Sequence, residues 1–261
     1  WGIALDDFNN DGFVDIITGS GANGEVYYYR NKADGTNTFN PKVKTGTISA
    51  SSYMMAIGSA DFNNDGNKDF VVSGNNSTLY QFKGKGDGTF TQTTLSSPAG
   101  SLVLRGKVGT DVDGDGNIDL VLWSCCNGGV YLYKGNGDGT FNSPVKVGTI
   151  GADSYGLVVN DFDEDGKKDI IVNTGASGDA YFLKGNGDGT FSTPMLTQSL
   201  HRSTYSAYTA GDYNNDGHLD ILAVTYTDKT MDFYPGLGDG TFGPKTTIVA
   251  ITGNSLAISA S

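Results

Sequence analysis

The chain has 261 residues, with 29 acidic against 17 basic ones and a formal net charge of −12. This length suffices for one sizeable domain or one array of repeats. There is no run of about 18 apolar residues, which argues against a transmembrane helix. The basic residues are nowhere clustered enough to follow a phosphate backbone, so we do not expect nucleic acid as a partner.

A nine-residue pattern, D-x-[DN]-x-D-G-x-x-D, occurs five times. Its copies begin at Asp7, Asp61, Asp111, Asp161 and Asp212, at intervals of 54, 50, 50 and 51 residues. A period near 50 residues with short apolar runs is typical of β-propeller blades or of another radial β array. We therefore expect a single domain over residues 1–261. Its repeats are placed at about 1–50, 51–100, 101–150, 151–201 and 202–252, and an extra terminal strand at 253–261.

The repeated loop has the residue types of a calcium site. Calcium takes six to eight oxygen ligands, and the first half of an EF-hand loop supplies them at positions 1, 3, 5 and 7, with Gly at position 6 for a sharp turn. An Asp at position 9 is expected to replace the closing Glu of the EF-hand. The alternative is a plain Asp/Gly turn between strands, which five complete copies disfavour.

The predicted ligands lie at positions 1, 3, 5, 7 (by the main-chain carbonyl) and 9 of each loop. They are Asp7, Asn9, Asp11, Phe13, Asp15; Asp61, Asn63, Asp65, Asn67, Asp69; Asp111, Asp113, Asp115, Asn117, Asp119; Asp161, Asp163, Asp165, Lys167, Asp169; and Asp212, Asn214, Asp216, His218, Asp220. Magnesium prefers stricter octahedral geometry, and no Cys or His side chain occupies a ligand position. We therefore expect about five Ca²⁺ ions as the cofactor.

Charge and compartment follow from these loops. Seventeen of the acidic residues lie at positions 1, 3, 5 and 9, so five bound ions would add +10 and leave about −2. Loops of this kind suit the millimolar calcium found outside cells. We expect a secreted or cell-surface protein.

Each repeat is expected to contain four strands. A short first strand, such as residues 156–159, precedes the loop. The second strand is apolar on both faces, as in a strand covered on both sides, and the third is rich in Tyr, Val and Phe. The second strands are expected at 16–17, 70–72, 120–123, 170–172 and 221–224, and the third at 26–29, 79–82, 130–133, 180–183 and 231–234. A fourth strand, such as residues 144–147, completes the unit.

A second motif, Gly-Asp-Gly-Thr-Phe, follows the third strand at 86–90, 137–141, 187–191 and 238–242, with a looser copy at 34–39. Asp-Gly favours a tight turn. We expect the Phe of each copy (Phe39, Phe90, Phe141, Phe191, Phe242) to pack between adjacent sheets, which gives the motif a structural role.

Together the acidic loop, the apolar strand after it and the G-D-G-T-F turn resemble FG-GAP/VCBS-type repeats. These are similar to the calcium-bearing blades of integrin α-subunit propellers and of some fungal and bacterial propeller lectins. The resemblance implies a β-propeller with one calcium per blade, between the first two strands. The literal Phe-Gly and Gly-Ala-Pro elements are not kept, and five repeats are fewer than the seven usual in integrins.

The two ends compete for one place. Residues 1–6 and 254–261 both align with the strand before a calcium loop. We favour a closed ring of five blades, because closure hides sheet edges. The alternative is that the chain forms part of a six- or seven-bladed propeller.

The loops opposite the calcium loops vary most between repeats and are expected to carry recognition. Tyr53, Asp153, Tyr155 and Tyr205 offer the aromatic and polar groups that suit a sugar, so we expect a lectin-like binding or adhesion module whose partner is a glycan or an extracellular protein. One alternative is a structural module that binds protein, and another is an accessory or catalytic propeller of a polysaccharide-degrading enzyme such as a lyase. No catalytic residues are predicted, and Cys125 and Cys126 are either free thiols or a vicinal disulfide.

Overall fold

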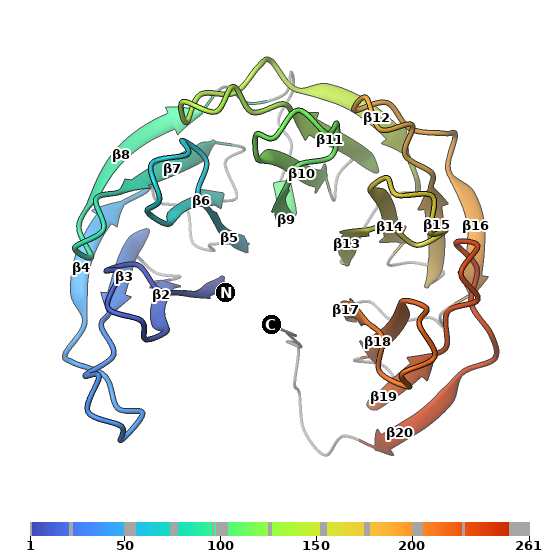
Figure 1. Cartoon of the computed structure of the whole chain (residues 1–261). Helices are drawn as coiled ribbons and strands as arrows, with labels where there is room; N and C mark the ends of the chain where they lie inside the picture. Colours follow the sequence, from blue (N-terminus) through green and yellow to red (C-terminus); the bar gives the residue numbers. More distant parts are fainter. Residues whose placement is uncertain are drawn as a thin grey trace. The chain divides into compact units, whose positions relative to one another are not determined.

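The computed structural model describes residues 2–20, 23–49, 56–73, 78–95, 97, 104–124, 127–151, 156–174, 178–199, 206–225 and 228–250. These residues form twenty β-strands in five four-stranded sheets, here named blades 1 to 5 in chain order (Figure 1). Blade 1 contains β1 (Ile3–Asp6), β2 (Asp15–Gly19), β3 (Glu25–Tyr29) and β4 (Val43–Thr47). Blade 2 contains β5 (Ala56–Ala60), β6 (Asp69–Ser73), β7 (Leu79–Gly84) and β8 (Phe90–Leu95).

The other three blades repeat this plan. Blade 3 contains β9 (Leu104–Thr110), β10 (Asp119–Ser124), β11 (Gly129–Tyr133) and β12 (Val145–Thr149). Blade 4 contains β13 (Leu157–Asn160), β14 (Asp169–Asn173), β15 (Asp179–Leu183) and β16 (Met195–Ser199). Blade 5 contains β17 (Ser206–Gly211), β18 (Asp220–Thr225), β19 (Thr230–Tyr234) and β20 (Thr246–Ala250).

Each sheet keeps its strands in chain order, with neighbours antiparallel. The predicted fold class is thus confirmed: the chain is all-β, with five four-stranded blades of the β-propeller type. Every second, third and fourth strand expected from the sequence is present, and the predicted first strand at 156–159 corresponds to β13.

Burial follows the sequence of each strand. The second strands β6, β10 and β14 are buried over their whole length, as their uninterrupted apolar runs predict. By contrast, the fourth strand β20 is exposed throughout, and β8 is exposed at most of its residues. The acidic loop therefore ends on a strand held firmly inside the protein.

The core lies between neighbouring blades. Phe8, Ile17 and Tyr28 of blade 1 pack in one cluster with Phe70 and Phe82 of blade 2. Blades 4 and 5 share a second cluster, in which Phe162 and Phe182 pack with residues of β18 and β19. Burying an apolar side chain in this way contributes about 1.5–3 kcal/mol, so the contact between blades supplies much of the stability.

Three of the five motif phenylalanines, Phe90, Phe141 and Phe242, reach across these contacts, as predicted, and the packing of Phe39 and Phe191 stays a prediction. The ring of Phe90 lies 5.8 Å from Phe8 of blade 1 and 4.9 Å from Phe70 of its own blade. Phe141 lies 5.4 Å from Phe62, and Phe242 lies 6.2 Å from Phe162. All these pairs are edge-to-face, an arrangement that adds to the stabilisation by area alone.

The chain divides into two compact units, and the division passes through blade 3. The first contains Trp1–Thr110, Gly116–Leu122 and Leu132–Val145; the second contains Asp111–Asp115, Trp123–Tyr131 and Lys146–Ser261. Within the first unit the first strands β1, β5 and β9 lie next to one another, and within the second unit β13 lies next to β17. The single domain over 1–261 and the closed five-bladed ring stay predictions, and residues 251–261 lie outside the described part.

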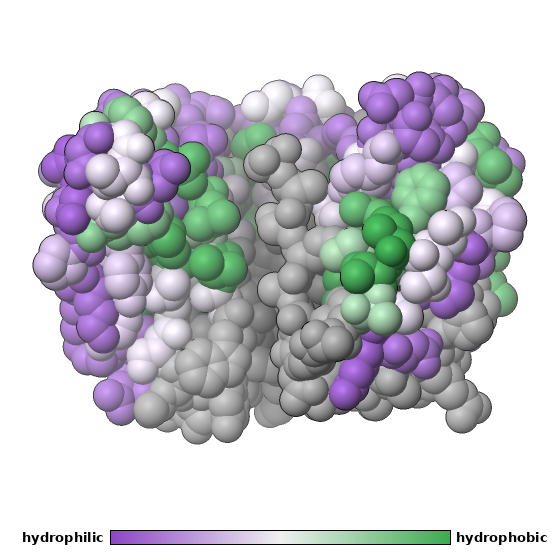
Figure 2. All heavy atoms as spheres, turned by 90° about the horizontal axis from the view of Figure 1, so that it is seen from below, coloured by the Kyte–Doolittle hydropathy of each residue, from purple (hydrophilic) through white to green (hydrophobic). Residues whose placement is uncertain are grey.

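The surface is mixed in character. Figure 2 shows one face on which hydrophobic residues are visible among hydrophilic ones. Ile3 and Leu5 of β1 and Ile248 of β20 are each about half exposed. Among the described residues, no helix of sufficient length and apolarity to cross a membrane is found.

Candidate metal centres

All five acidic loops are described in full, and each connects the first and second strands of its blade. The strand registers show that the two ends of the loop are held side by side. Its last residue, at position 9, pairs with the residue that ends the first strand, as in Asp6 with Asp15 and Asn160 with Asp169. The residues at positions 1 to 8 therefore turn within a closed end of a β-hairpin.

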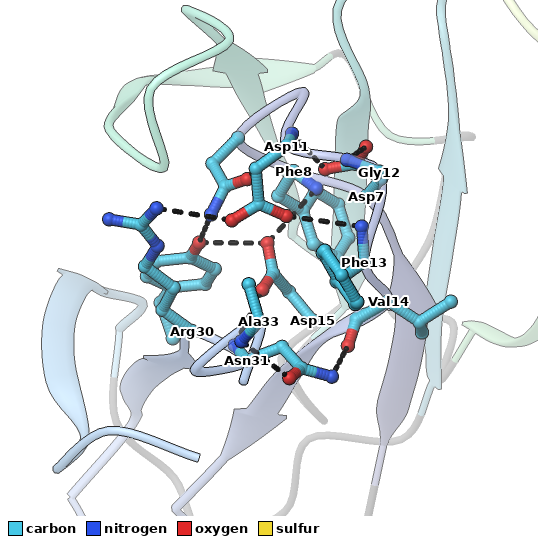
Figure 3. A network of polar contacts seen from close by, with 12 residues as sticks. Asp7, Phe8, Asp11, Gly12, Phe13, Val14, Asp15, Arg30, Asn31 and Ala33 are labelled. Carbon is cyan, nitrogen blue, oxygen red and sulfur yellow. Dashed lines mark hydrogen bonds and ion pairs between the residues drawn. The ribbon is translucent and has the colours of Figure 1, made fainter. Parts of the chain in front are cut away.

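The first loop shows the local geometry (Figure 3). The carboxylate of Asp7 accepts hydrogen bonds from the backbone N–H groups of Asp11 (3.1 Å) and Gly12 (2.7 Å). Asp11 in turn accepts one from the N–H of Phe13 (3.1 Å). These side-chain to backbone bonds hold the carboxylates inside the loop.

The second, fourth and fifth loops repeat these bonds; in the third, the carboxylate of Asp111 accepts from the N–H of Gly114 at 2.7 Å. Position 1 accepts from the N–H of position 6 at 2.8 Å in the second loop, 2.9 Å in the fourth and 3.0 Å in the fifth. Position 6 is Gly with φ between 83° and 94° in all five copies, and a Cβ there would have nothing within 4 Å. The need for Gly is therefore one of backbone conformation, not of space.

Position 9 has a different role from the other acidic positions. Asp69 is fully buried, and its two oxygens accept from the N–H groups of Phe62 (3.2 Å) and Gly84 (2.7 Å). Asp169 accepts in the same way from Phe162 and Gly185. Position 9 thus joins the start of the loop to the end of the third strand, a second role that its place in the sequence did not indicate.

Burial acts on the protonation of these carboxyl groups. It raises the pKa of Asp69 to about 6, against the opposing effect of the two backbone hydrogen bonds. Burial also raises the pKa of Asp15 and of Asp169. A divalent ion beside them would favour the charged form and reverse this direction.

Two loops bring three carboxylates together. In the third loop, ligand oxygens of Asp111, Asp113 and Asp115 lie within 4.8 Å of one another. In the fourth, Asp161, Asp163 and Asp169 do the same. These two loops carry Asp at position 3, where the other three have Asn. Hard oxygen ligands on a preorganised loop fit Ca²⁺, so the donor set agrees with the predicted ion.

Basic side chains approach some of the same carboxylates. Lys184, which directly follows β15, places its ammonium nitrogen against Asp163 and 2.9 Å from Asp165. Arg30 lies 3.1 Å from Asp11. Lys184 holds the pKa of Asp165 below its ordinary value, and the two aspartates raise the pKa of Lys184. Each of these cations neutralises part of the carboxylate charge that a bound metal ion would also neutralise.

Successive loops also contact one another through the side chains at positions 4 and 7, for which the sequence predicts no side-chain contact. The side chain at position 4 of one loop meets position 7 of the next: Asn10 with Asn67 (2.7 Å), Asn64 with Asn117 (3.2 Å), and Glu164 with His218. Position 4 has a positive φ in each of these three loops. His218, predicted as a carbonyl donor, thus uses its side chain to bind the neighbouring loop, and Glu164 raises its pKa. The carbonyls of Phe13, Asn67, Asn117, Lys167 and His218 stay predicted ligands.

The residues proposed for ligand binding, Tyr53, Asp153, Tyr155 and Tyr205, lie outside the described residues, as do Cys125 and Cys126. Their predicted roles stay predictions.

The blades and their acidic loops together define a β-propeller built from loop-bearing repeats. The chain belongs to the family of FG-GAP-like repeats, whose family model matches residues 7–72, 111–172 and 161–223, more than half of its length. Among curated proteins, no sequence matches significantly.

Several solved structures share the fold. An Agrocybe aegerita lectin that recognises non-reducing terminal N-acetylglucosamine superposes with a TM-score of 0.70 at 22% identity, covering 95% of this chain. A Lactobacillus plantarum protein has a TM-score of 0.66 at 16% identity, covering 95% of this chain and 71% of its own. A mutant of AofleA from Arthrobotrys oligospora has a TM-score of 0.59 at 13% identity, covering 99% of this chain and 76% of its own. The present chain spans 65% of the length of the Agrocybe lectin.

Proposed function

We propose that this chain is a calcium-stabilised, extracellular carbohydrate-binding module. The observation that carries the calcium part is the gathering of three carboxylates within 4.8 Å in each of two loops. Like charges at this separation repel one another unless a cation or a proton neutralises them. Hydrogen bonds from backbone N–H groups already orient the carboxylates, so a calcium ion gains its ligands at little cost in ordering the loop.

A calcium titration tests this part. Calorimetry on the purified, chelator-stripped chain is expected to give about five ions per chain, one for each loop. The variant Asp113→Asn with Asp115→Asn should lose one of them. The matched control is Asp228→Asn, which changes an exposed aspartate outside the loops and should leave the stoichiometry unchanged. Equal stoichiometry in all three proteins would contradict the assignment.

The carbohydrate part is supported by the fold that the chain shares with the Agrocybe lectin. A rigid β scaffold that presents variable loops at repeated positions suits recognition of a small ligand. The binding face would depend on calcium through the stability of the blades, since the ions lie in the loops between the first two strands of each blade. We assign the chain no catalytic step, and we place it outside the cytoplasm because that is where calcium is abundant enough for such loops.

A glycan array tests this part. The full chain, labelled and applied in millimolar calcium, is expected to bind a restricted set of glycans and to lose them after chelation. An array without hits in calcium would overturn the carbohydrate assignment. Binding that resists competition by simple sugars but follows a protein component would instead support a protein-binding adhesion module.

A further inference from the structure

One position beside the acidic loops differs in charge between the blades. In every blade a backbone N–H at the end of the third strand donates to the position-9 aspartate, at 2.7 to 2.8 Å. We call the residue directly before this N–H the flanking residue. In blades 1 to 5 it is Arg30, Lys83, Lys134, Lys184 and Pro235, in that order. The flanking residue is thus a cation in four blades and an uncharged proline in the fifth.

In blades 1 and 4 the flanking cation contacts predicted calcium ligands of its own blade. Arg30 lies 3.1 Å from Asp11, a contact drawn in Figure 3. The ammonium group of Lys184 contacts Asp163 and lies 2.9 Å from Asp165. A calcium ion needs the same oxygens and carries charge of the same sign. The ion must therefore displace the cation or bind beside it, and both reduce the free energy gained on binding.

In blade 2 the flanking cation has a different partner. Lys83 donates at 3.0 Å to the main-chain carbonyl of Asp138, in the turn of the following repeat, and its charge also acts on the Asp138 carboxylate. In blade 5 the flanking residue Pro235 has no charge to place against the loop. Competition of the kind made by Arg30 and Lys184 is therefore not expected in the second and fifth loops.

The first, second and fifth loops form a matched set, because all three have Asp, Asn, Asp and Asp at positions 1, 3, 5 and 9. The affinity of an oxygen site for calcium depends on the charge of its ligands and on its rigidity. The three loops bring the same number of carboxylates to the ion. In the first of them, the guanidinium group of Arg30 neutralises part of the charge at position 5.

The fourth loop has an additional carboxylate at position 3, and Lys184 offsets it. The side chain of Asp163 is 11% exposed, and one of its oxygens contacts the ammonium group. Its other oxygen, Oδ1, is buried without a hydrogen-bond partner among the described residues, a costly state that a bound cation would relieve. Lys167 adds a second ammonium group 3.6 Å from Asp165. The loop thus combines a strong set of ligands with cations that oppose the ion.

We propose that the flanking residue sets the calcium affinity of its loop. Arg30 and Lys184 compete with the ion, so the first loop fills at higher calcium concentration than the second and fifth, and the fourth binds more weakly than its four carboxylates alone would allow. The proposal rests on the calcium part of the function proposed above and adds its regulation: the module responds to calcium in steps, and the competing cations determine which loops load last.

The test titrates the chelator-stripped full chain with calcium chloride and follows binding by calorimetry. Arg30→Gln and Lys184→Gln should each strengthen one of the sites about three- to fivefold, the factor expected for removing an exposed ion pair. Arg30→Lys and Lys184→Arg retain the charge and should retain the affinities of the unmodified chain. Circular dichroism in saturating calcium verifies that each variant is folded.

Lys83→Gln is the matched control, because it removes one positive charge from the same flanking position but from a residue that donates to the Asp138 carbonyl. It should leave the calcium affinities unchanged. A gain as large as that of Arg30→Gln would show a general effect of net charge and would overturn the proposal.

A double-mutant cycle locates the effect in the first loop. Asp11→Asn removes the partner of Arg30, so Arg30→Gln in that background should strengthen no site further. A gain that adds in full to the Asp11→Asn chain would show that Arg30 acts elsewhere, against the proposal.

The outcomes also separate this proposal from the broader function. If about five ions bind and neither Arg30→Gln nor Lys184→Gln changes an affinity, the calcium function stands and the flanking residue does not regulate it. If the unmodified chain binds no calcium, both proposals fail.

Discussion

The buried aspartate at position 9 makes the free energy of unfolding depend on pH. Without calcium this free energy should fall as pH rises, and bound calcium should cancel the fall. In the second loop, burial raises the pKa of Asp69 to about 6 from an ordinary value of 3.8. A folded-state pKa above the unfolded one means that the fold holds the proton more tightly, so ionisation weakens the fold as pH rises from about 4 to about 6. Bound calcium would cancel this loss, because it favours the ionised form.

We therefore predict a pH-dependent difference between the unmodified chain and Asp69→Asn in chelator. From pH 4 to pH 6 the unmodified chain should lose about 2 kcal/mol of unfolding free energy relative to the variant, measured by urea denaturation at each pH. The comparison isolates Asp69 from residues such as Asp165, whose lowered pKa acts in the opposite direction. A constant difference between the two proteins over this range would contradict the prediction.

Lys184 is predicted to neutralise carboxylate charge in the fourth loop when no calcium is bound there. Its ammonium nitrogen contacts Asp163 and lies 2.9 Å from Asp165, so without calcium it neutralises part of the fourth loop. Lys184→Met should lower Tm by about 2–4 °C in chelator and by much less in saturating calcium, as followed by circular dichroism.

Lys83→Met is the matched control for this prediction, because Lys83 precedes the equivalent glycine of blade 2 but donates to the carbonyl of Asp138. It should not show the same dependence on calcium. An equal loss of Tm for Lys184→Met with and without calcium would show that Lys184 is not exchanged for the ion.

At the scale of elements, the Gly-Asp-Gly-Thr-Phe turn joins the second, third and fifth repeats to the repeat before each of them. The backbone N–H of its second glycine donates to a carbonyl in the preceding acidic loop: Gly88 to Phe8 (3.2 Å), Gly139 to Phe62 (3.0 Å) and Gly240 to Phe162 (3.0 Å). The aspartate of the turn accepts from the backbone N–H and the hydroxyl of its threonine, as in Asp87 with Thr89. The motif thus sets both its own turn and the spacing of two blades.

We predict that Phe90→Ala loosens blade 1 from blade 2. Phe90 packs against Phe8, Tyr28 and Phe70, and truncating a ring in such a cluster costs about 3 kcal/mol or more. Urea denaturation measures the loss. The control is Val43→Ala in the exposed part of β4, which should change the free energy of unfolding by no more than about 0.5 kcal/mol. A similarly small effect of Phe90→Ala would contradict a role of the motif phenylalanine in the core.

At the scale of the whole molecule, acidity is the feature that calcium must balance. Seventeen of the 29 acidic residues lie at positions 1, 3, 5 and 9 of the loops, and the net charge without ions is −12. Each ion present at a hundred times its dissociation constant adds about 2.7 kcal/mol to the stability of the fold. Several sites therefore add up to a large part of the stability of one domain.

Chelation is accordingly predicted to lower Tm by about 10 °C or more, measured by calorimetry in EDTA and in millimolar calcium. Raising the sodium chloride concentration in EDTA should recover part of the loss, because salt screens repulsion between exposed charges. An unchanged melt in EDTA would contradict a structural role for calcium.

The sequence by itself determined the elements that depend on neighbours along the chain. The acidic loop is local: its ligands lie within nine residues, and its turn depends on one glycine with positive φ and on hydrogen bonds between positions 1 and 6. The strands were equally predictable, because continuous apolar runs such as residues 170–172 have one favourable environment, the buried middle of a sheet. For the same reasons the number of sheets and the family could be inferred from the spacing of two motifs.

Only the tertiary structure decided what happens across neighbouring blades. The contact of Asn10 with Asn67, the hydrogen bond from Gly88 to Phe8 and the packing of Phe62 against Phe141 each join residues about 50 or more positions apart. Gln81 is an ordinary strand residue in the sequence, and only the register shows that it takes in β7 the place of Tyr28 in β3 and of Phe182 in β15. Packing between sheets depends on the shapes of both partners at once, and a pattern read along one strand contains only one of them.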